Sequence, residues 1–408
     1  MKRCRLISFF IIGLFFWETP VFAQRFSFGQ GRSRDAIHFK LIHNLIIIPV
    51  YINDRGPFNF ILDTGVGPLV ITDPSLSDFI ESNHFPLFRM RGRGIGPELE
   101  AYVVNNLTAR VGKASMRQFP GILLKDDPFQ LSAYMGMPIH GIMGSAFFTS
   151  FIVEVNYISK RLFFYNPERS VRKRGEKLPI QLLRDKPYIK IEINTLDGKT
   201  DTLLLLVDSG AGHAVSLDLT SDEDWLKPEK TIVANLGMGL GGPIKGLIGR
   251  LQTVRLGTYA FNEVIAAFPE YEDEALRLLM TEKDGSIGGE LLKRFIVLFD
   301  YSRQEIYLRK NRNYKKSFEH DMSGMEIYSL DEKRKRFFVS RIEPNSPADK
   351  AQFLVDDEIL SINFKEARGY SLDEINNLLQ KESAGVLVFE ILRKNQILFK
   401  LLSLKRRI

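Results

Sequence analysis

The feature that most constrains the fold of this chain is an internal repeat. Residues 60–65 read FILDTG and residues 205–210 read LLVDSG, which places Asp63 and Asp208 at equivalent positions. Further blocks recur in the same register: TARVG at 108–112 with TVRLG at 253–257, GIMG at 141–144 with GSIG at 285–288, and FIV at 151–153 with FIV at 295–297. A chance match would not hold its register over several blocks. The sequence therefore contains two copies of one unit, at 38–166 and 186–309, with a period too long for a solenoid and suited to two lobes.

Each copy reads as mostly β structure. Short runs rich in Ile, Val, Leu and Phe are separated by Gly, Pro, Asn and Asp, which is typical of strands joined by turns. The runs predict strands at 45–52, 58–62, 68–72, 189–193, 203–207 and 214–217. One or two helical turns are expected at 144–148 and 288–293, before the closing strand of each copy. The polar, basic stretch 167–179 is predicted to be a linker between the lobes.

A small α/β unit is predicted at residues 322–404, because about eighty residues suffice for one domain. Its strand candidates are 337–342 and 358–362, followed by a final hairpin of 386–392 with 397–401. Ser346 and Pro347 are typical of an N-cap and first helical residue. Ser371 with Glu374 forms a capping box for a helix that should end near Glu382.

The N-terminus is interpreted as a secretory signal peptide at residues 1–23. Basic residues precede an apolar run at 6–17, which is too short to span a bilayer, and 21–23 offers a small-residue cleavage site. The single cysteine, Cys4, precedes the apolar run and would leave with the signal, so the mature chain would lack disulfides and cysteine metal sites. We expect an exported protein, periplasmic or extracellular, with no transmembrane segment in its mature chain. An uncleaved membrane anchor is the alternative.

Charge and histidine usage argue against two other classes of function. The 56 Lys and Arg residues exceed the 49 Asp and Glu residues, giving a net charge of +7, but they are spread along the chain. Nucleic acid is therefore not an expected partner. The six histidines show no spacing typical of metal ligands, and no metal or other cofactor is expected.

The repeated Asp-Thr/Ser-Gly triplet carries the predicted chemistry. In each copy an apolar strand delivers the aspartate into a glycine-containing turn, and two lobes related by an approximate twofold axis can bring both turns to one cleft. Two carboxyl groups at such a short distance share one proton, because the repulsion between two negative charges disfavours ionisation of both. One can then activate water while the other polarises a carbonyl, which is peptide hydrolysis without a metal. The alternative is an ordinary turn in a non-catalytic relative.

These residues resemble the pepsin and retroviral aspartic proteases, in the form of bacterial single-chain members with two retroviral-like lobes. The two triplets match the catalytic motifs, and residues 142–144 match the hydrophobic-hydrophobic-Gly element beneath the active loop; the second copy has Ser286 at one hydrophobic position. The resemblance implies a mostly β, two-lobed pepsin/retropepsin-like acid protease fold. It assigns catalysis to Asp63 and Asp208, and support of the active-site loops to Thr64, Gly65, Ser209 and Gly210.

Two glycine-rich segments resemble the flap tips that close over substrate in this family. Their residues are Gly94, Ile95 and Gly96 in the first copy, and Gly239, Leu240 and Gly241 in the second. The second segment also fits GxGxxG, but it lacks the strand-to-helix context that a dinucleotide site needs. Neither tip carries the tyrosine of pepsin-like flaps. His213 either faces substrate or is a hydrogen-bonded rim residue.

The C-terminal unit resembles a small α/β PDZ domain in the bacterial, protease-associated arrangement. The matching stretches are 338–348 and 357–363, while Gln352 and Asp356 stand where the family usually has glycine. The resemblance assigns peptide binding by strand addition to Gly324, Met325, Glu326 and Ile327. A peptide or a C-terminal ligand would be the partner of this domain.

Together these features predict an exported aspartic endopeptidase that acts on polypeptide substrates. The alternative is a non-catalytic peptide-binding or scaffolding protein that uses the protease-like cleft and the PDZ domain. The intact Asp and Gly residues in both triplets favour the enzyme, since a binding protein has no need of two mutually repelling buried carboxylates.

Overall fold

The computed structural model describes residues 25–80, 86–90, 96, 98–127, 130–194, 199–219, 225–239, 241–271, 284–331 and 335–408. The predicted signal peptide lies outside these residues. Within the described part of the chain, no helix is long and apolar enough to cross a membrane. The chain is mostly β, which confirms the fold class predicted from its sequence.

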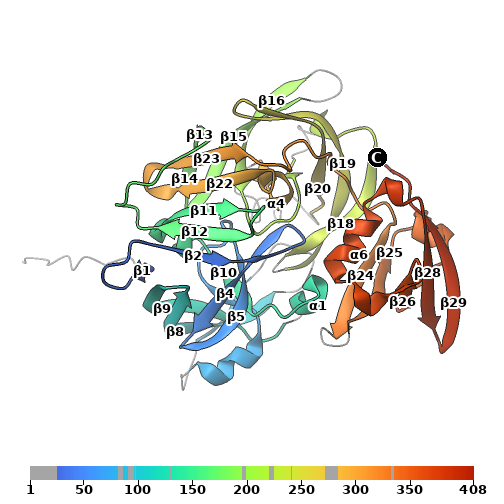
Figure 1. Cartoon of the computed structure of the whole chain (residues 1–408), viewed down its shortest axis with the longest axis horizontal. Coiled ribbons are helices and arrows are strands. Elements are labelled where there is room, and N and C mark those ends of the chain that lie inside the picture. The colour runs from blue at the N-terminus through green and yellow to red at the C-terminus, as the bar shows by residue number, and fades with distance from the viewer. Residues whose placement is uncertain are drawn as a thin grey trace, which may run out of the picture.

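The strands of the first copy form a sheet that closes on itself (Figure 1). In hydrogen-bonding order the ring runs β4, β5, β10, β6, β9, β8 and back to β4. Strand β7 extends β8 into a hairpin, β1 pairs with β9, and β3 pairs with β4. The bounds are β1 Ser27–Phe28, β3 Lys40–Ile42, β4 Leu45–Ile52, β5 Arg55–Leu62, β6 Val70–Ile71, β7 Leu87–Met90, β8 Leu99–Val111, β9 Ala114–Leu124 and β10 Gly141–Met143, with helices η1 Pro74–Phe79, α1 Leu131–Met135 and α2 Ala146–Ser150.

The second copy repeats this ring strand for strand. Its order is β15, β16, β21, β17, β20, β19 and back to β15, with β18 extending β19 into a hairpin. The parallel pairs β5 with β10 and β6 with β9 of the first ring correspond to the parallel pairs β16 with β21 and β17 with β20 of the second. The bounds are β14 Gln181–Leu183, β15 Lys186–Asn194, β16 Thr200–Val207, β17 Val215–Leu217, β18 Thr231–Gly239, β19 Gly242–Leu256, β20 Tyr259–Pro269, β21 Gly285–Ile287 and α4 Gly289–Leu292. The internal repeat of the sequence thus corresponds to two barrels with one strand order.

A further sheet joins the two lobes, in the order β13, β23, β22, β11, β12 and β2. At its centre, β11 from the first copy pairs with β22 from the second, with Val155 opposite Val297. The bounds are β2 Arg34–His38, β11 Ile152–Asn156, β12 Arg161–Tyr165, β13 Glu176–Pro179, β22 Phe295–Asp300 and β23 Glu305–Lys310, with η3 Tyr301–Arg303. The stretch 167–179 is therefore not wholly a linker, because its last four residues add a strand to the edge of β23.

The hydrophobic core is continuous across both lobes and the sheet between them. Alternate residues of each strand face inward, and phenylalanines fill much of the space where α2 meets the shared sheet. Phe148 of α2 packs edge-on against Phe299 of β22, with ring centroids 5.2 Å apart. Buried aromatic contacts of this kind fix the position of one lobe relative to the other.

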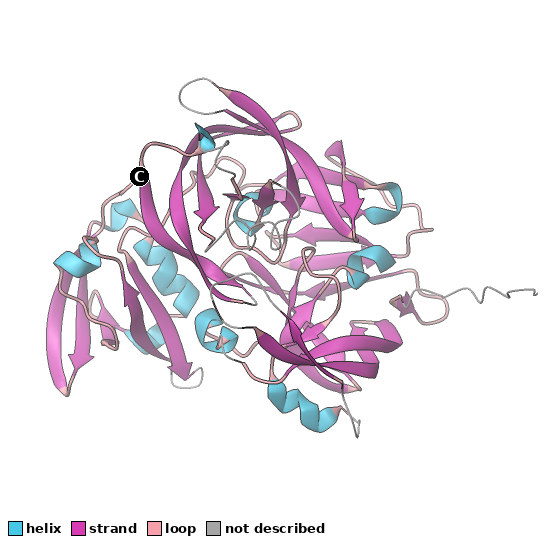
Figure 2. Ribbon diagram, turned by 180° about the vertical axis from the view of Figure 1, so that it is seen from behind, coloured by secondary structure: helices cyan, strands magenta, loops and turns pink. Residues whose placement is uncertain are grey.

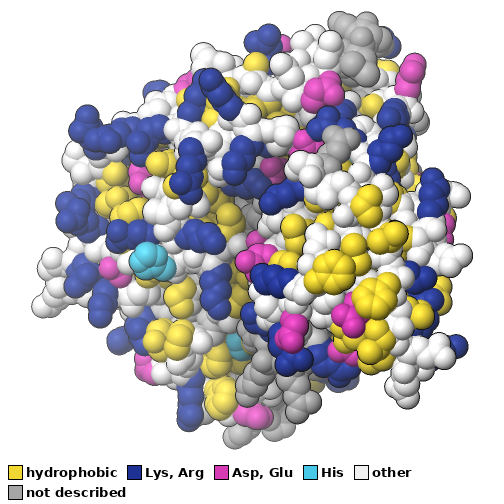
Figure 3. Space-filling view, turned by 45° about the vertical axis from the view of Figure 1, so that its right-hand side comes forward, with side chains coloured by type: hydrophobic (Ala, Val, Ile, Leu, Met, Phe, Trp, Pro, Cys, Tyr) yellow, Lys and Arg dark blue, Asp and Glu magenta, His cyan; other side chains and the backbone are white. Residues whose placement is uncertain are grey.

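The C-terminal domain is a separate sheet with its own core. Its order is β24, β25, β26, β28 and β29, with β27 paired to β26. Figure 3 shows apolar side chains gathered on one part of the surface. Strand β29 of this domain exposes Ile397, Phe399 and Leu401. The bounds are β24 Met325–Asp331, β25 Arg336–Ile342, β26 Glu358–Ile362, β27 Lys365–Glu366, β28 Val386–Arg393 and β29 Gln396–Ser403, with α5 Pro347–Lys350, η4 Ala367–Gly369, α6 Leu372–Leu379 and η5 Glu382–Ala384.

Local sequence signals set the helices of this domain as predicted. The Ser346 side chain accepts a hydrogen bond from the backbone of Asp349 at the start of α5. Ser371 and Glu374 form the reciprocal capping box at the start of α6. Helix α6 ends at Leu379 and not near Glu382, because the next residues turn into the short η5.

The C-terminal domain packs against both lobes (Figures 1 and 2). Helix α1 of the first lobe lies against β24, and a Cβ atom on Gly136 at its end would lie 3.0 Å from the Leu372 side chain of α6. From the second lobe, Arg250 donates hydrogen bonds to the carbonyl oxygens of Phe318 and Ile408. Phe318 also belongs to the core of the lobes. The domain is therefore attached to the body of the protein on two sides.

Candidate active site

The two triplets sit in equivalent loops at the ends of β5 and β16. The backbone N–H of Asp63 donates to the carbonyl oxygen of Met143 at 2.9 Å, and that of Asp208 donates to Ile287 at 2.8 Å. Each aspartate is thus tied to the last residue of the parallel strand, β10 or β21, that passes beneath its loop. The hydrophobic-hydrophobic-Gly elements hold the loops in the way that the resemblance implies.

Thr64 and Ser209 link the two loops across the interface between the lobes. The Thr64 hydroxyl accepts from the N–H of Ser209 at 2.9 Å and donates to the carbonyl of Val207. The Ser209 hydroxyl accepts from the N–H of Thr64 at 3.1 Å and donates to the carbonyl of Leu62 at 2.9 Å. Both side chains are fully buried, so each hydroxyl satisfies two backbone groups that water cannot reach.

The glycines of the triplets bring the carboxyl groups together. The N–H of Gly65 donates to Oδ1 of Asp63 at 2.6 Å, and that of Gly210 donates to Oδ1 of Asp208 at 2.9 Å. A Cβ atom on Gly210 would collide with the carboxyl group of Asp63, and one on Gly65 would lie 3.2 Å from Oδ1 of Asp208. Each glycine therefore leaves room for the aspartate of the opposite lobe.

The two carboxyl groups form one coupled acidic pair. Asp63 is 8% exposed, and its burial raises its pKa well above the ordinary value. The charge of Asp208 and a hydrogen bond between the two carboxyl groups raise the pKa of Asp63 further, while the Gly65 N–H and the nearby Lys186 lower it. The balance is upward, so the pair retains a proton at pH values where a free aspartic acid is ionised.

This geometry agrees with what protein-family comparison finds. Residues 48–147, which include the first loop, match the family model of aspartyl proteases, and residues 338–393 match that of PDZ domains. The chain carries an aspartyl protease domain and a PDZ domain. A search of curated proteins finds no match to it. The protease match covers the first lobe, and the second lobe resembles the first through the internal repeat and the shared strand order.

The departure at Ser286 in the second lobe has a local explanation. The Ser286 hydroxyl lies 2.9 Å from Nε2 of His213, a hydrogen-bond distance. The serine in the hydrophobic-hydrophobic-Gly element therefore has a polar partner in the histidine that follows the second triplet. His213 also lines the pocket beside the dyad, which places it at the wall of the site.

The structure describes some of the residues that the sequence predicts for the two flap tips. Gly239 pairs with Gly242 at the end of the β18–β19 hairpin, which makes Gly239 and Gly241 part of its tip. The N–H of Gly96, in the corresponding segment of the first lobe, donates to the carbonyl oxygen of Gly241. The two predicted tips therefore meet. Gly94, Ile95 and Leu240 lie outside the described residues.

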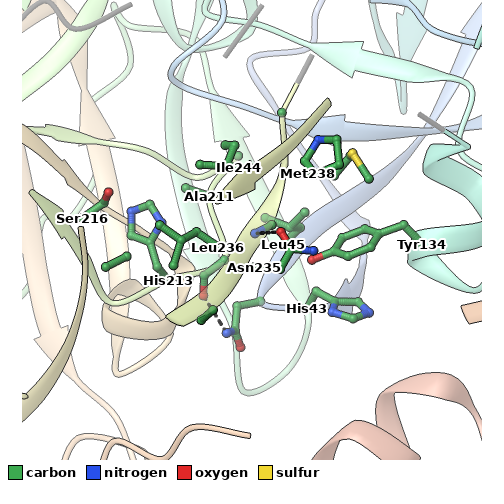
Figure 4. A pocket seen from close by; sticks show the side chains of 18 of the residues that line it. His43, Leu45, Tyr134, Ala211, His213, Ser216, Asn235, Leu236, Met238 and Ile244 are labelled. Carbon is green, nitrogen blue, oxygen red and sulfur yellow. Dashed lines mark hydrogen bonds between the residues drawn. The ribbon is translucent and has the colours of Figure 1, made fainter. Parts of the chain in front are cut away.

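Asp63 and Asp208 line a cavity of about 1400 Å³. Figure 4 shows His213 and Ser216 on one side of it and His43 and Tyr134 on the other, with Leu236 and Asn235 of the β18 flap strand between them. Sequence reasoning missed His43, Tyr134 and Asn235, because they come from a turn, a helix and a strand remote from the triplets.

The hairpin tip between β3 and β4 is another part of the site that sequence reasoning missed. The Asn44 side chain donates to the carbonyl oxygen of Gly212, just beyond the second triplet, and to the Glu290 carboxylate. His43 stacks on Tyr134 with ring centroids 5.0 Å apart, and burial lowers the pKa of its imidazole. Residues 43 and 44 both adopt positive φ, as the two central residues of a tight hairpin turn do. The His-Asn pair between two strands was the sequence signal that could have indicated this turn.

Three of the four peptide-binding residues predicted for the PDZ domain also line this cavity. Gly324 has φ of +69°, and a Cβ there would collide with the Ser346 side chain. Met325, Glu326 and Ile327 begin β24 and line the cavity together with residues of the two lobes. Among the described residues, no group of three or more His, Cys, Asp or Glu side chains is placed to hold a metal ion.

Proposed function

We propose that this protein is an exported aspartic endopeptidase that hydrolyses polypeptides with water activated by Asp63 and Asp208. The observation that carries the proposal is the coupled pair of carboxyl groups, one from each lobe, held by reciprocal Thr64 and Ser209 hydrogen bonds. Two mutually repelling acids, of which Asp63 is buried and Asp208 half-buried, are costly to maintain in a protein that only binds peptides. This cost favours the enzyme over the non-catalytic alternative.

The reaction needs one proton shared by the dyad. The ionised carboxyl group takes a proton from water as the water oxygen bonds to the carbonyl carbon, and the protonated carboxyl group donates its proton to the carbonyl oxygen. Collapse of the resulting diol returns a proton to the dyad, breaks the C–N bond and delivers a proton to the departing amine. The dyad ends with one proton, as it began.

The surroundings of the dyad serve this cycle. Burial and the neighbouring charge raise the pKa of Asp63, which keeps the proton on the pair. The two glycine N–H groups fix one oxygen of each carboxyl group and leave the other oxygens for water and substrate. The flap strand and tips would cover the bound chain and limit access of solvent.

The pH–rate profile tests the shared proton. Because the pKa of Asp63 is raised, the singly protonated pair should persist to higher pH, and we expect a bell-shaped profile with its maximum at about pH 5–7. Val66 and Ala211 follow the triplets, where a Ser or Thr hydroxyl would stabilise the ionised form. Replacing both by Ser should move the acidic limb to lower pH, measured as the initial cleavage rate of an unstructured protein.

A wild-type maximum below about pH 4 would contradict this account of the dyad. So would an unchanged acidic limb in a Val66→Ser, Ala211→Ser variant that folds normally. Either result would mean that other hydrogen-bond donors control the ionisation of the pair.

A further inference from the structure

The two sides of the cavity beside the dyad can be compared position by position, because the lobes share one strand order. In the first lobe, β4 pairs with β5 so that Ile47 is opposite Ile61. Continued by two residues, this antiparallel register places Leu45 abreast of Asp63. On the other side of β5, Ile61 pairs with Ile142 of β10. The first wall, made of Leu45, Ile61 and Ile142, lines the cavity and belongs to one apolar cluster.

The second wall, at the equivalent place in the second lobe, carries a cation. Here β15 pairs with β16 so that Tyr188 is opposite Leu206. The same continuation of the register places Lys186 abreast of Asp208, where the first lobe has a leucine. Lys186 and Leu206 both line the cavity, and Lys186 is half-buried. Its charge acts on the dyad, since it lowers the pKa of Asp63.

Polar side chains continue the second wall beyond its lysine. Ser286 of β21 stands where the first lobe has Ile142, and it pairs with Leu206 on one side and with Ser216 of β17 on the other. The Ser286 hydroxyl lies 2.9 Å from Nε2 of His213. His213 and Ser216 both line the cavity and lie on the same side of it in Figure 4. A substrate side chain on the second wall would therefore meet polar groups where the first wall offers hydrocarbon.

A carboxylate of the protein also reaches the cavity on this side, but it has cationic partners of its own. Glu290 lines the cavity, and the Asn44 side chain bridges it to the loop after the second triplet. The Glu290 carboxylate forms ion pairs with Lys293 and Arg294. Two cations thus balance the charge of Glu290, and it does not cancel the charge of Lys186.

The chemistry of the two walls favours different substrate side chains. Between about pH 5 and 7, a substrate Asp or Glu is ionised and a lysine is protonated. A hydrogen bond from an ammonium group to a carboxylate is stronger than one between neutral groups, and a basic substrate side chain would meet a like charge. On the first wall a charged side chain would lose its hydration without gaining a partner, so an apolar side chain is preferred there.

We propose that the cavity binds an apolar substrate side chain on the first wall and an acidic one on the second, where Lys186 holds its carboxylate. The substrate class is accordingly an unfolded polypeptide with Asp or Glu on one side of the cleaved bond and an apolar residue on the other. This inference rests on the proposed function for the identity of the cleaved bond. Its binding test does not require turnover.

The first test measures binding of short peptides to the full chain carrying Asp63→Asn. The peptides contain Leu-Glu or Glu-Leu at their centre, and each has a counterpart in which Gln replaces Glu. Gln keeps the shape of the side chain and removes its charge. We expect the Glu peptide of at least one order to bind at least about tenfold more tightly than its Gln counterpart. Equal binding of Glu and Gln peptides in both orders would overturn the proposal.

The second test reverses the charge of the second wall. In the same Asp63→Asn chain, Lys186→Glu should invert the preference, so that a peptide with Lys in place of Glu binds at least about tenfold more tightly than the Glu peptide. Lys190→Glu is the matched control, because Lys190 lies on the same strand and is exposed. This control should keep the preference for Glu. The same Glu-to-Lys ratio in both variants would overturn the proposal.

Lys186→Leu gives the second wall the residue of the first, which the shared fold accommodates, so it keeps the test open if the charge reversal disturbs folding. The preference for Glu over Gln should disappear in this variant, and its persistence in a folded protein would overturn the proposal. Wild-type cleavage separates this inference from the proposed function. Cleavage at sites without an adjacent acidic residue as fast as at acidic sites would refute the inference alone. A binding preference for Glu without any cleavage would refute the proposed function alone.

Discussion

Replacing Asp208 by Asn should lower the rate of polypeptide cleavage by at least about 10³-fold while the chain still folds. The amide has nearly the shape of the carboxyl group but cannot accept a proton from water, so the dyad loses the shared proton. Asp208 is the more informative of the two aspartates, because the family match covers the first lobe only. The measurement is the initial rate on an unstructured protein, with unfolding curves to show that the variant is folded.

Asp201→Asn provides the matched control for this change. Asp201 lies near the start of β16, the same strand that delivers Asp208 at its other end. Its replacement removes one carboxylate from the second lobe without touching the dyad, and cleavage should continue at close to the normal rate. Near-normal cleavage by the Asp208→Asn protein would show that the second lobe takes no part in catalysis.

Removing the Thr64 hydroxyl should lower the free energy of unfolding by about 2–4 kcal/mol. Thr64→Val keeps the shape of the side chain, but it leaves the N–H of Ser209 and the carbonyl of Val207 buried without their partner. Catalysis should fall as well, because these bonds set the distance between the two loops. Denaturant unfolding and the cleavage rate measure the two effects.

Thr64→Ser is the control for the loss of stability, since the second loop uses a serine at the equivalent position. It restores the hydroxyl and should recover most of the stability and activity. If Thr64→Val and Thr64→Ser unfold at the same denaturant concentration, the hydrogen bonds across the lobes do not stabilise the site.

The sequence could predict the parts of the fold that depend on residues close together in the chain. The duplicated triplets, the glycine beneath each loop and the caps of α5 and α6 depend on residues close together in the chain, so their patterns are readable. The shared sheet is different. Strand β13 pairs with β23 across more than 120 residues, and its polar composition reads as a linker because an edge strand needs little burial.

The parts of the site that sequence could not predict depend on contacts between distant segments. His43 and Asn44 reach the second triplet loop from the first lobe, and no spacing in the sequence connects them. The presence of Ser286 at a usually hydrophobic position is explained only by its hydrogen-bond distance to His213, which the sequence does not show. A PDZ domain can be recognised from its own residues, but its place in the wall of the cavity beside Asp63 and Asp208 cannot.

The most direct test of the account is cleavage itself. The purified full chain is incubated with an unstructured protein from about pH 3 to pH 8, beside the same chain carrying Asp63→Asn, and the products are identified by mass. We predict internal cleavage by the wild type, greatest at about pH 5–7, and none by the Asp63→Asn protein. Absence of cleavage by the wild type at every pH, or equal cleavage by both proteins, would contradict the claim that Asp63 and Asp208 form a catalytic dyad.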